Sequence, residues 1–315
     1  MGGCEIGVQV AIDFTLSNGD PRHPSSLHYL NPQTSMNDYT EAIKAVMEIL
    51  ENYDADKQFP VYGFGGKVPG QNTVSHCFAL NGNIYNPEVN GTKGVMNSYY
   101  NALSKVSLYG GTEFSSVLDY VNGYCEQIAR EINQFHQKYT ICLIMTDGII
   151  NDLDRTIHQI VRGSVLPLSI IIVGIGDADF DQMETLDGDV NPLYSKITRS
   201  YCQRDIVQFV PFRELKRDPV RLAKQVLAEV PKQLTDYFQA RGIQPNPKKM
   251  DEKQGLRIQG LMQNQMAQMM KVPDNFFMMS KINMVNFLAQ QGYDPGLVGN
   301  YIDEHGFPNV DQFWA

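Results

Sequence analysis

An acid and two hydroxyls alternate at the end of the first apolar run of the chain. Residues 8–17 read VQVAIDFTLS, in which Asp13, Thr15 and Ser17 follow a short, buried-strand pattern. In an extended chain, every second side chain points to the same side. The three oxygen-bearing side chains are therefore expected to face one point, with Phe14 and Leu16 directed into the core.

Two later stretches carry oxygen ligands at the boundary of an element. The sequence LYGGTEFSSVLDYV, residues 108–121, contains a Gly-Gly turn, then Thr112, then a helical pattern. The sequence KYTICLIMTDG, residues 138–148, is an apolar strand followed by Asp147. Hydroxyl and carboxylate oxygens suit hard cations. The three stretches together predict a divalent-cation site, with Mg²⁺ or Mn²⁺ as the first choice and Ca²⁺ as the alternative. The predicted ligands are Asp13, Thr15, Ser17, Thr112 and Asp147.

The predicted ligand set has few negative charges. In it the hydroxyls bind the cation directly, and the two acids bind it directly or through water. A cation held in this way keeps its affinity for further anions and keeps coordination positions open. We therefore expect a carboxylate from a partner protein to complete the coordination shell.

Strands and helices alternate along most of the chain. Near-continuous apolar strands between helices predict an α/β fold, with a doubly wound, mostly parallel sheet covered on both faces. Ligands bind such sheets at the carboxyl ends of the strands, where the strand order reverses. The expected strands are 8–14, 59–66, 73–80, 138–148, 166–176 and 205–212, with 73–80 at an edge, and the expected helices are 37–53, 92–105, 114–135, 152–163 and 218–240. Asp13 and Asp147 then end the first and fourth strands and meet in one crevice.

The acid–hydroxyl pattern resembles the metal-ion-dependent adhesion site of von Willebrand factor A domains, which reads D-x-S-x-S with a later Thr and a later Asp. Thr15 takes the place of the first Ser and keeps the hydroxyl. Longer stretches resemble the A domain of copines over residues 6–243. The matching stretches include AIDFTLSNGDPRHPSSLHYLNP (11–32), FPVYGFGGKVP (59–69), LIMTDGIINDLDRTIHQIV (143–161) and LPLSIIIVGIGDADFDQMETLDGD (166–189).

The resemblance implies a copine-type von Willebrand factor A domain without the paired C2 domains that precede it in the family. In copines the C2 domains carry Ca²⁺-dependent phospholipid binding, so direct membrane binding is not expected of this chain alone. The A domain is regarded as a module that recruits target proteins. The resemblance thus implies a metal-dependent adaptor in the cytoplasm that is recruited to the plasma membrane.

Other interpretations of the same residues stay open. An isolated D-x-T-x-S after a strand is often a turn with side-chain-to-backbone hydrogen bonds. A metal-dependent phosphohydrolase using Asp13 as nucleophile is the enzymatic alternative. Such enzymes place a second acid two residues later, where this chain has Thr15, and no Ser-His-Asp order or G-x-S-x-G motif is evident. His23 and His28 are interpreted as solvent-exposed or packing residues, and Asp152 and Asp154 as favouring the start of a helix.

Composition narrows the classes of partner. The chain has 315 residues and a net charge of −9, which disfavours nucleic acid and anionic membranes as partners. The five cysteines are widely spaced without a C-x-x-C pair, so neither a zinc module nor a disulfide framework is expected. No apolar run is long enough to span a bilayer. These features are typical of a protein from a reducing compartment.

The last part of the chain differs from the rest. Residues 1–240 are predicted to form the A domain, 241–255 a Pro- and Lys-containing linker, and 256–315 a small helical module. Of 14 methionines, eight follow residue 249. Those at helical spacing lie with Leu261 at Met262, Met266, Met269 and Met270. This stripe is expected to form the core of a small bundle, with an adaptable binding surface as the alternative. A scaffold acting through this module is a further alternative function.

Overall fold

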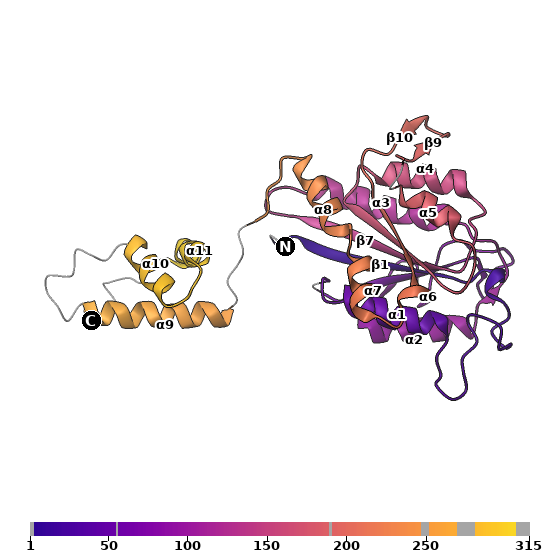
Figure 1. The fold of residues 1–315 in the computed structure, drawn as a ribbon, viewed down its shortest axis with the longest axis horizontal. Helices are drawn as coiled ribbons and strands as arrows, with labels where there is room; N and C mark the ends of the chain where they lie inside the picture. The colour runs from indigo at the N-terminus through magenta and orange to yellow at the C-terminus, as the bar shows by residue number, and fades with distance from the viewer. Residues whose placement is uncertain (1–2, 55, 189–190, 247–251, 270–280, 307–315) are drawn as a thin grey trace. The chain divides into compact units, whose positions relative to one another are not determined.

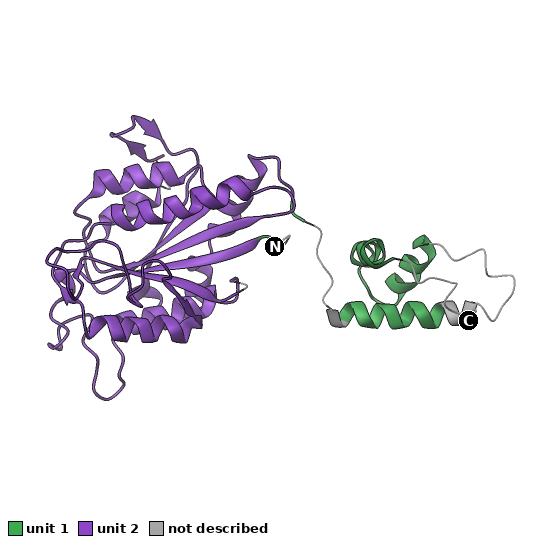
Figure 2. Ribbon diagram, turned by 180° about the vertical axis from the view of Figure 1, so that it is seen from behind, with its two compact units in different colours: residues 1–4, 245–315 green, residues 5–244 purple. Residues whose placement is uncertain are grey.

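The computed structural model describes residues 3–54, 56–188, 191–246, 252–269 and 281–306. They form two compact units, residues 5–244 and residues 1–4 with 245–315 (Figure 2). No helix in these described ranges is both long enough and apolar enough to cross a membrane. The larger unit contains all five predicted site residues.

The larger unit is built on a central sheet with strand order β11-β8-β7-β1-β2-β4, in which β5 also pairs with β2 (Figure 1). The strands from β2 through β1, β7 and β8 to β11 are parallel, whereas β4 and β5 are antiparallel edge strands. The strands are β1 Glu5–Asp13, β2 Gln58–Phe64, β3 Gly66–Lys67, β4 Phe78–Ala79, β5 Glu88–Asn90, β6 Ser107–Leu108, β7 Lys138–Thr146, β8 Leu168–Gly174, β9 Tyr194–Ser195, β10 Ser200–Tyr201 and β11 Val207–Pro211.

Helices cover both faces of this sheet (Figure 1). The helices are α1 Asp38–Leu50, α2 Gly91–Leu103, α3 Ser115–Glu131, α4 Leu153–Gly163, α5 Asp181–Asp187, α6 Phe212–Leu215, α7 Pro219–Val226, α8 Val230–Gln239, α9 Glu252–Met269, α10 Lys281–Gln290 and α11 Pro295–His305. Helices α1 and α2 lie on one face and α3 and α4 on the other, as a doubly wound sheet requires. The predicted fold class is confirmed.

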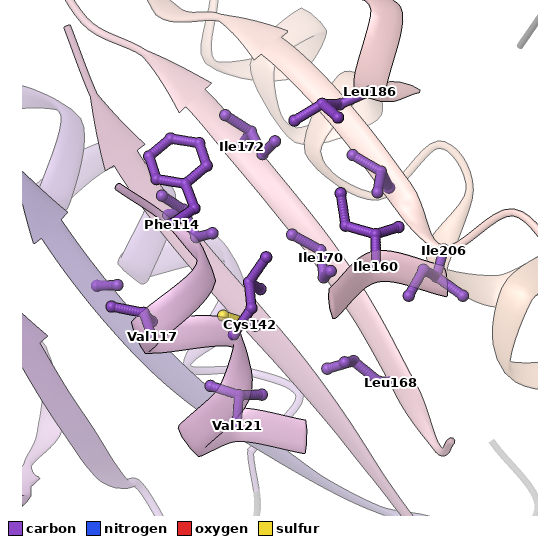
Figure 3. Packing of buried hydrophobic residues seen from close by; sticks show 14 of the residues in the cluster. Phe114, Val117, Val121, Cys142, Ile160, Leu168, Ile170, Ile172, Leu186 and Ile206 are labelled. Carbon is purple, nitrogen blue, oxygen red and sulfur yellow. The ribbon is translucent and has the colours of Figure 1, made fainter. Parts of the chain in front are cut away.

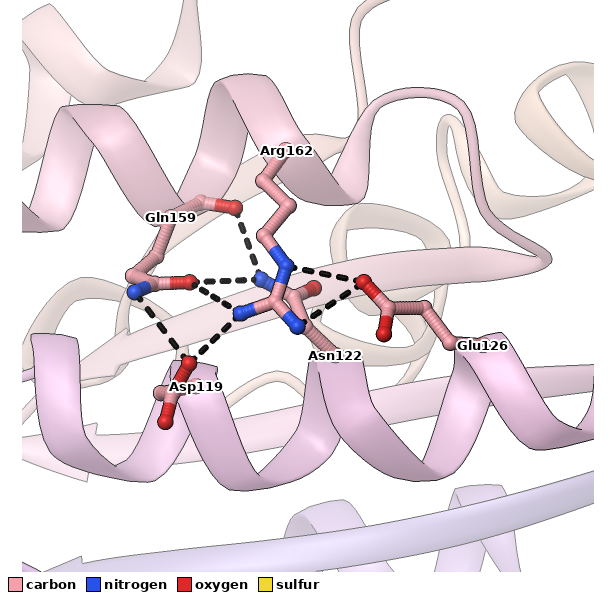
Figure 4. Close-up of polar contacts among 5 residues, drawn as sticks. All are labelled: Asp119, Asn122, Glu126, Gln159 and Arg162. Carbon is pink, nitrogen blue, oxygen red and sulfur yellow. Dashed lines mark hydrogen bonds and ion pairs between the residues drawn. The ribbon is translucent and has the colours of Figure 1, made fainter. Parts of the chain in front are cut away.

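The face under α3 and α4 shows how the sequence builds the core. Phe114, Val117 and Val121 pack with Ile160 against side chains of β7 and β8 such as Cys142 (Figure 3). On the outer side, Arg162 of α4 forms ion pairs with two acids of α3, at 2.5 Å to Asp119 and 2.8 Å to Glu126 (Figure 4). The apolar inner stripes and this polar bridge fix α3, whose first turn adjoins the predicted site.

Several predicted elements differ in extent. The strand expected at 73–80 is reduced to Phe78–Ala79, and it lies at an edge as expected. The helix expected at 218–240 is two helices, α7 and α8, because regular helix stops at Val226 and restarts only at Val230. The helix α5 and the β9–β10 hairpin were not predicted. These segments are short and mostly polar, so they carry little apolar periodicity.

The smaller unit has its own apolar core, made by α9, α10 and α11. Met262 and Met284 are 2% and 4% exposed, and they pack with Leu288. Helix α9 begins at Glu252, within the stretch predicted as a linker, and Tyr301 approaches its backbone at Gly255. Met250, Met270, Met278 and Met279 lie outside the described residues, as do the side chains of Met266 and Met269.

Candidate metal site at the carboxyl edge of the sheet

The two predicted acids follow neighbouring strands. Asp13 is the last residue of β1, and Asp147 directly follows Thr146, the last residue of β7. The strands β1 and β7 are parallel partners, with Ile12 opposite Met145. From β1 the chain continues to β2 on one side, whereas β7 leads to β8 on the other, so this is the point where strand order reverses. The acids therefore meet where such sheets bind ligands.

Four of the five predicted ligands form one continuous chain of polar contacts. Asp13 Oδ1 accepts from Thr15 N at 2.7 Å and from Thr15 Oγ1 at 2.5 Å. Thr15 Oγ1 lies 2.9 Å from Ser17 Oγ, which in turn donates to Asp147 Oδ1 at 2.9 Å. Asp13, Thr15 and Asp147 are buried, whereas Ser17 is exposed. The cluster thus reaches the surface at Ser17.

The backbone departs from the predicted strand geometry at Leu16. Residues Leu16–Asn18 form a single 3-10 turn, so the alternation of side-chain directions stops after Thr15. Phe14 is fully buried as expected, but Leu16 is 62% exposed, and its predicted burial in the core is wrong. The turn, rather than extended chain, brings Ser17 to Asp147.

The fifth predicted ligand, Thr112, is buried on a loop that packs against the other four. Leu16 N donates to Gly110 O at 3.0 Å, which joins this loop to the one after β1. Thr112 N donates to Asn151 Oδ1 at 2.7 Å, and Asn151 N donates to Thr112 O at 2.8 Å. Within the described ranges, no hydrogen bond joins the Thr112 hydroxyl to the other four side chains. Backbone hydrogen bonds therefore join the loop that carries Thr112 to the loop after β1 and to the segment after Asp147.

Two glycines permit this close packing of loops. Gly65 has φ of +76°, and a Cβ there would lie 2.2 Å from Thr15 Cγ2. A Cβ at Gly111 would lie 2.3 Å from Asn151 Oδ1, the atom that accepts from Thr112 N. A side chain at either position would displace a loop that carries a predicted ligand.

Further polar residues support Asp13, and the sequence pattern did not identify them. Thr146 Oγ1 donates to Asp13 Oδ2 at 2.7 Å, and Asn18 Nδ2 donates to Asp13 Oδ1 at 3.0 Å. In the sequence, Thr146 is the polar end of an apolar strand and Asn18 directly follows Ser17. The sequence signal that could have identified them is that each lies next to a predicted ligand, Thr146 before Asp147 and Asn18 after Ser17.

His28 supports the backbone of the site from behind. It is buried, its ring stacks on Tyr39 with centroids 4.3 Å apart, and its Nε2 lies 3.0 Å from Asp13 O. Because a carbonyl oxygen only accepts, Nε2 carries the proton and Nδ1 accepts from Tyr99 Oη at 2.7 Å. Burial lowers the pKa of His28 to about 3. His28 is thus a packing residue, with both ring nitrogens engaged.

Asp152 has a different role from the one predicted. It was expected to favour the start of its own helix, but its carboxylate accepts from Phe114 N and Ser115 N, both at 3.1 Å. It also accepts from Thr156 Oγ1 at 2.9 Å. Asp152 therefore satisfies the first turn of α3 from the neighbouring segment and ties that turn to α4.

The two acids of the cluster are harder to ionise than ordinary carboxyl groups, because their pKa values are raised. Burial raises the pKa of Asp13, and burial followed by the nearby Asp13 charge raises the pKa of Asp147 to about 7. Among the described residues, no lysine or arginine pairs with either acid. Two buried carboxylates without a cationic partner are costly to ionise.

A count of the available protons also shows that the two acids are costly to ionise together. Three short oxygen–oxygen contacts link Asp13, Thr15, Ser17 and Asp147, but the two hydroxyls supply only two protons. When both acids are ionised, one contact therefore has no proton and sets lone pairs against each other. A cation removes this deficit, so the donor set fits a divalent metal ion. No group of three or more His, Cys, Asp or Glu side chains in the described ranges could hold a metal, consistent with a set of two acids and hydroxyls.

Several solved structures are similar to the chain. One is the manganese-loaded TRAP protein of Plasmodium vivax, with 12% identity, a TM-score of 0.42, and coverage of 68% of this chain and 71% of that chain. Another is proximal thread matrix protein 1 from the mussel byssus, with 18% identity, a TM-score of 0.37, and coverage of 70% and 48%. A structure of the latter with a zinc-occupied MIDAS motif has 14% identity, a TM-score of 0.36, and coverage of 71% and 46%. This chain thus spans about half the length of the mussel protein.

A protein-family model gives the identification. The copine model matches residues 26–246. The match includes Thr112 and Asp147, the loop glycines and the strands from β2 to β11, whereas Asp13, Thr15 and Ser17 precede it. Since the matched segment covers more than half of the chain, the protein belongs to the copine family.

Proposed function

We propose that this chain is a divalent-metal-dependent protein-binding domain that acts as an adaptor. The proton-deficient cluster of Asp13, Thr15, Ser17 and Asp147 is the observation that carries the proposal. These four side chains, with Thr112, would hold the cation. When bound, the cation supplies a Lewis-acidic point of attraction for a carboxylate of a partner protein. The cytoplasmic location and the recruitment to the plasma membrane that the resemblance implies are part of this proposal.

The protein groups have separate tasks in this scheme. Asp13 and Asp147 supply negative charge from below the surface, and Ser17 forms the part of the cluster that a partner can reach. Thr146 and Asn18 orient the Asp13 carboxylate through both of its oxygens. Asn151 holds the backbone of Thr112.

The phosphohydrolase alternative receives less support. A phosphoaspartyl nucleophile must expose a carboxylate oxygen to the phosphorus, but Asp13 is fully buried and both of its oxygens accept hydrogen bonds. Hydrolysis of p-nitrophenyl phosphate with Mg²⁺, lost in an Asp13→Asn variant, would favour the alternative.

Calorimetric titration of Mg²⁺, Mn²⁺ and Ca²⁺ tests the metal site. We expect saturable binding to the wild type and an affinity lowered about 100-fold or more in an Asp13→Asn/Asp147→Asn double variant. Asp54→Asn is the matched control, because Asp54 is a buried carboxylate at the amino end of the same sheet, where it accepts from Val8 N. Equal binding by all three proteins, or no binding by a folded wild type, would contradict the metal site.

A further inference from the structure

Three large apolar side chains are exposed on the three loops of the candidate site. Leu16 is 62% exposed, Tyr109 57% and Ile149 57%. Leu16 lies between two predicted ligands, Tyr109 precedes the Gly-Gly turn that leads to Thr112, and Ile149 follows Asp147 by two residues. Single exposed apolar residues are ordinary, but one on each of the three loops around a polar cluster calls for an explanation.

Backbone contacts join the three loops that carry these residues. Leu16 N donates to the oxygen of Gly110, the residue directly after Tyr109. Thr112 forms a parallel bridge with Ile150, the residue directly after Ile149. We call Leu16, Tyr109 and Ile149 the apolar rim. Ser17, the exposed member of the polar cluster, directly follows one of its residues.

A positive charge lies at the same rim. Lys67 Nζ is 3.4 Å from the centroid of the Tyr109 ring, a cation–π contact that also orients the ring. No acidic side chain in the described part of the chain forms an ion pair with Lys67. The rim thus offers apolar contact together with an unneutralised charge, which complements an acidic partner.

We propose that the apolar rim and Lys67 select the partner: a protein segment in which an acidic side chain is flanked by large apolar side chains. The acid reaches the polar cluster at Ser17, and the flanking side chains cover the rim and exclude water from the charged contact. Burial of apolar area around a charged contact is typical of the residues that dominate binding energy. This inference rests on the proposed function, because it assumes that the acid binds at the metal site.

A display experiment tests this preference. The probe is a phage library of 13-residue segments with a fixed central Glu and randomised flanks, selected on the wild-type chain in Mg²⁺. A second library with a central Gln serves as reference. We expect Glu-dependent recovery with enrichment of Leu, Ile, Phe and Tyr in the flanks. A Leu16→Ser/Tyr109→Ser/Ile149→Ser variant should bind the selected segments at least about tenfold more weakly while keeping its Mg²⁺ affinity.

The matched control removes exposed apolar groups that lie outside the three loops of the site. Tyr85, Phe135 and Val220 are 96%, 91% and 81% exposed, so a Tyr85→Ser/Phe135→Ser/Val220→Ser variant should bind like the wild type. Glu-dependent recovery without apolar enrichment would overturn the rim and leave the proposed function intact. Equal recovery of the Glu and Gln libraries would overturn the proposed function and the rim together. Loss of binding in both triple variants would also overturn the specific role of the rim.

Discussion

At the scale of single residues, the candidate site depends on where a few polar atoms are placed. Asp13 receives hydrogen bonds on both carboxylate oxygens, yet with both acids ionised the contacts that link it to Asp147 through Thr15 and Ser17 lack one proton. Burial makes this shortage costly, because little water can replace the missing partner. With both acids ionised, the groups of the protein alone thus leave room for one positive charge.

Another buried acid, Asp54, allows a prediction about the pH dependence of stability. Burial is the main cause that raises its pKa to about 6, to which the nearby Asp56 also contributes, while the N–H groups of Val8 and Lys57 oppose the shift. The other charged groups lining the same shallow cavity of about 50 Å³ are Glu5, Glu88 and Lys138. Because the folded chain binds this proton more tightly than the unfolded chain, Asp54 makes folding less favourable as the pH rises from about 4 to about 6.

We therefore expect an Asp54→Asn variant to gain thermal stability relative to the wild type as the pH rises from 4 to 7. The loss of a hydrogen bond in the variant lowers Tm equally at every pH, so only the change in the Tm difference with pH is informative. Calorimetry across this range measures it, with Asp154→Asn as the exposed control. A Tm difference that does not vary with pH would contradict the assigned shift.

At the scale of elements, the site depends on the segments that hold α3 and its preceding loop. Asp152 binds the first N–H groups of α3, and Asn151 binds Thr112, so two successive residues after β7 position the third loop. The first N–H groups of a helix lack partners within the helix, which makes an acceptor from another segment valuable. The geometry of Thr112 is thus set by the segment that carries Asp147.

An Asp152→Ala substitution should lower the free energy of unfolding by about 1–3 kcal/mol, because it leaves buried backbone donors without an acceptor. Urea unfolding of the wild type and the variant measures the difference. Asp154→Ala is the matched control, since Asp154 lies at the start of the same helix and forms only an exposed ion pair with Lys196. Similar losses of unfolding free energy in the two variants would contradict a stabilising role for the hydrogen bonds from α3 to Asp152.

At the scale of the whole molecule, the chain forms two units with separate apolar cores. Among the residues that the structure describes, the core of the smaller unit consists of few side chains, and a core of this size supports only a small free energy of unfolding. The two units are therefore expected to unfold as separate steps, with the smaller unit first.

Deletion of residues 250–315 should leave the Tm and the Mg²⁺ titration of the larger unit unchanged. Within the full chain, Leu288→Ala should abolish the unfolding step of the smaller unit alone, because Leu288 is fully buried in its core. Ile282→Ala on the same helix is the control, since Ile282 is 70% exposed. Calorimetry resolves the steps. If the deletion abolished metal-dependent partner binding, the scaffold alternative acting through the helical module would gain support.

The sequence by itself determined the fold class and the family. Apolar strands alternating with helices have few folding solutions other than a doubly wound sheet, and two strands that end in acids must bring those acids to one edge. It also predicted Asp13, Thr15 and Asp147 as neighbours, because period-two spacing and sheet topology act over short and regular distances. Ser17 joins them through a turn, which period-two spacing does not describe.

Only the tertiary structure decided the remaining features. Leu16 turns outward because a 3-10 turn interrupts the strand, and that turn is held by a hydrogen bond from Leu16 N to the distant Gly110. The contacts of Asp152 with α3, and of His28 with Asp13, likewise join residues that no local pattern relates. The hydrogen bonds that shape this site are made between loops far apart in sequence, so their partners exist only once the sheet has brought the loops together.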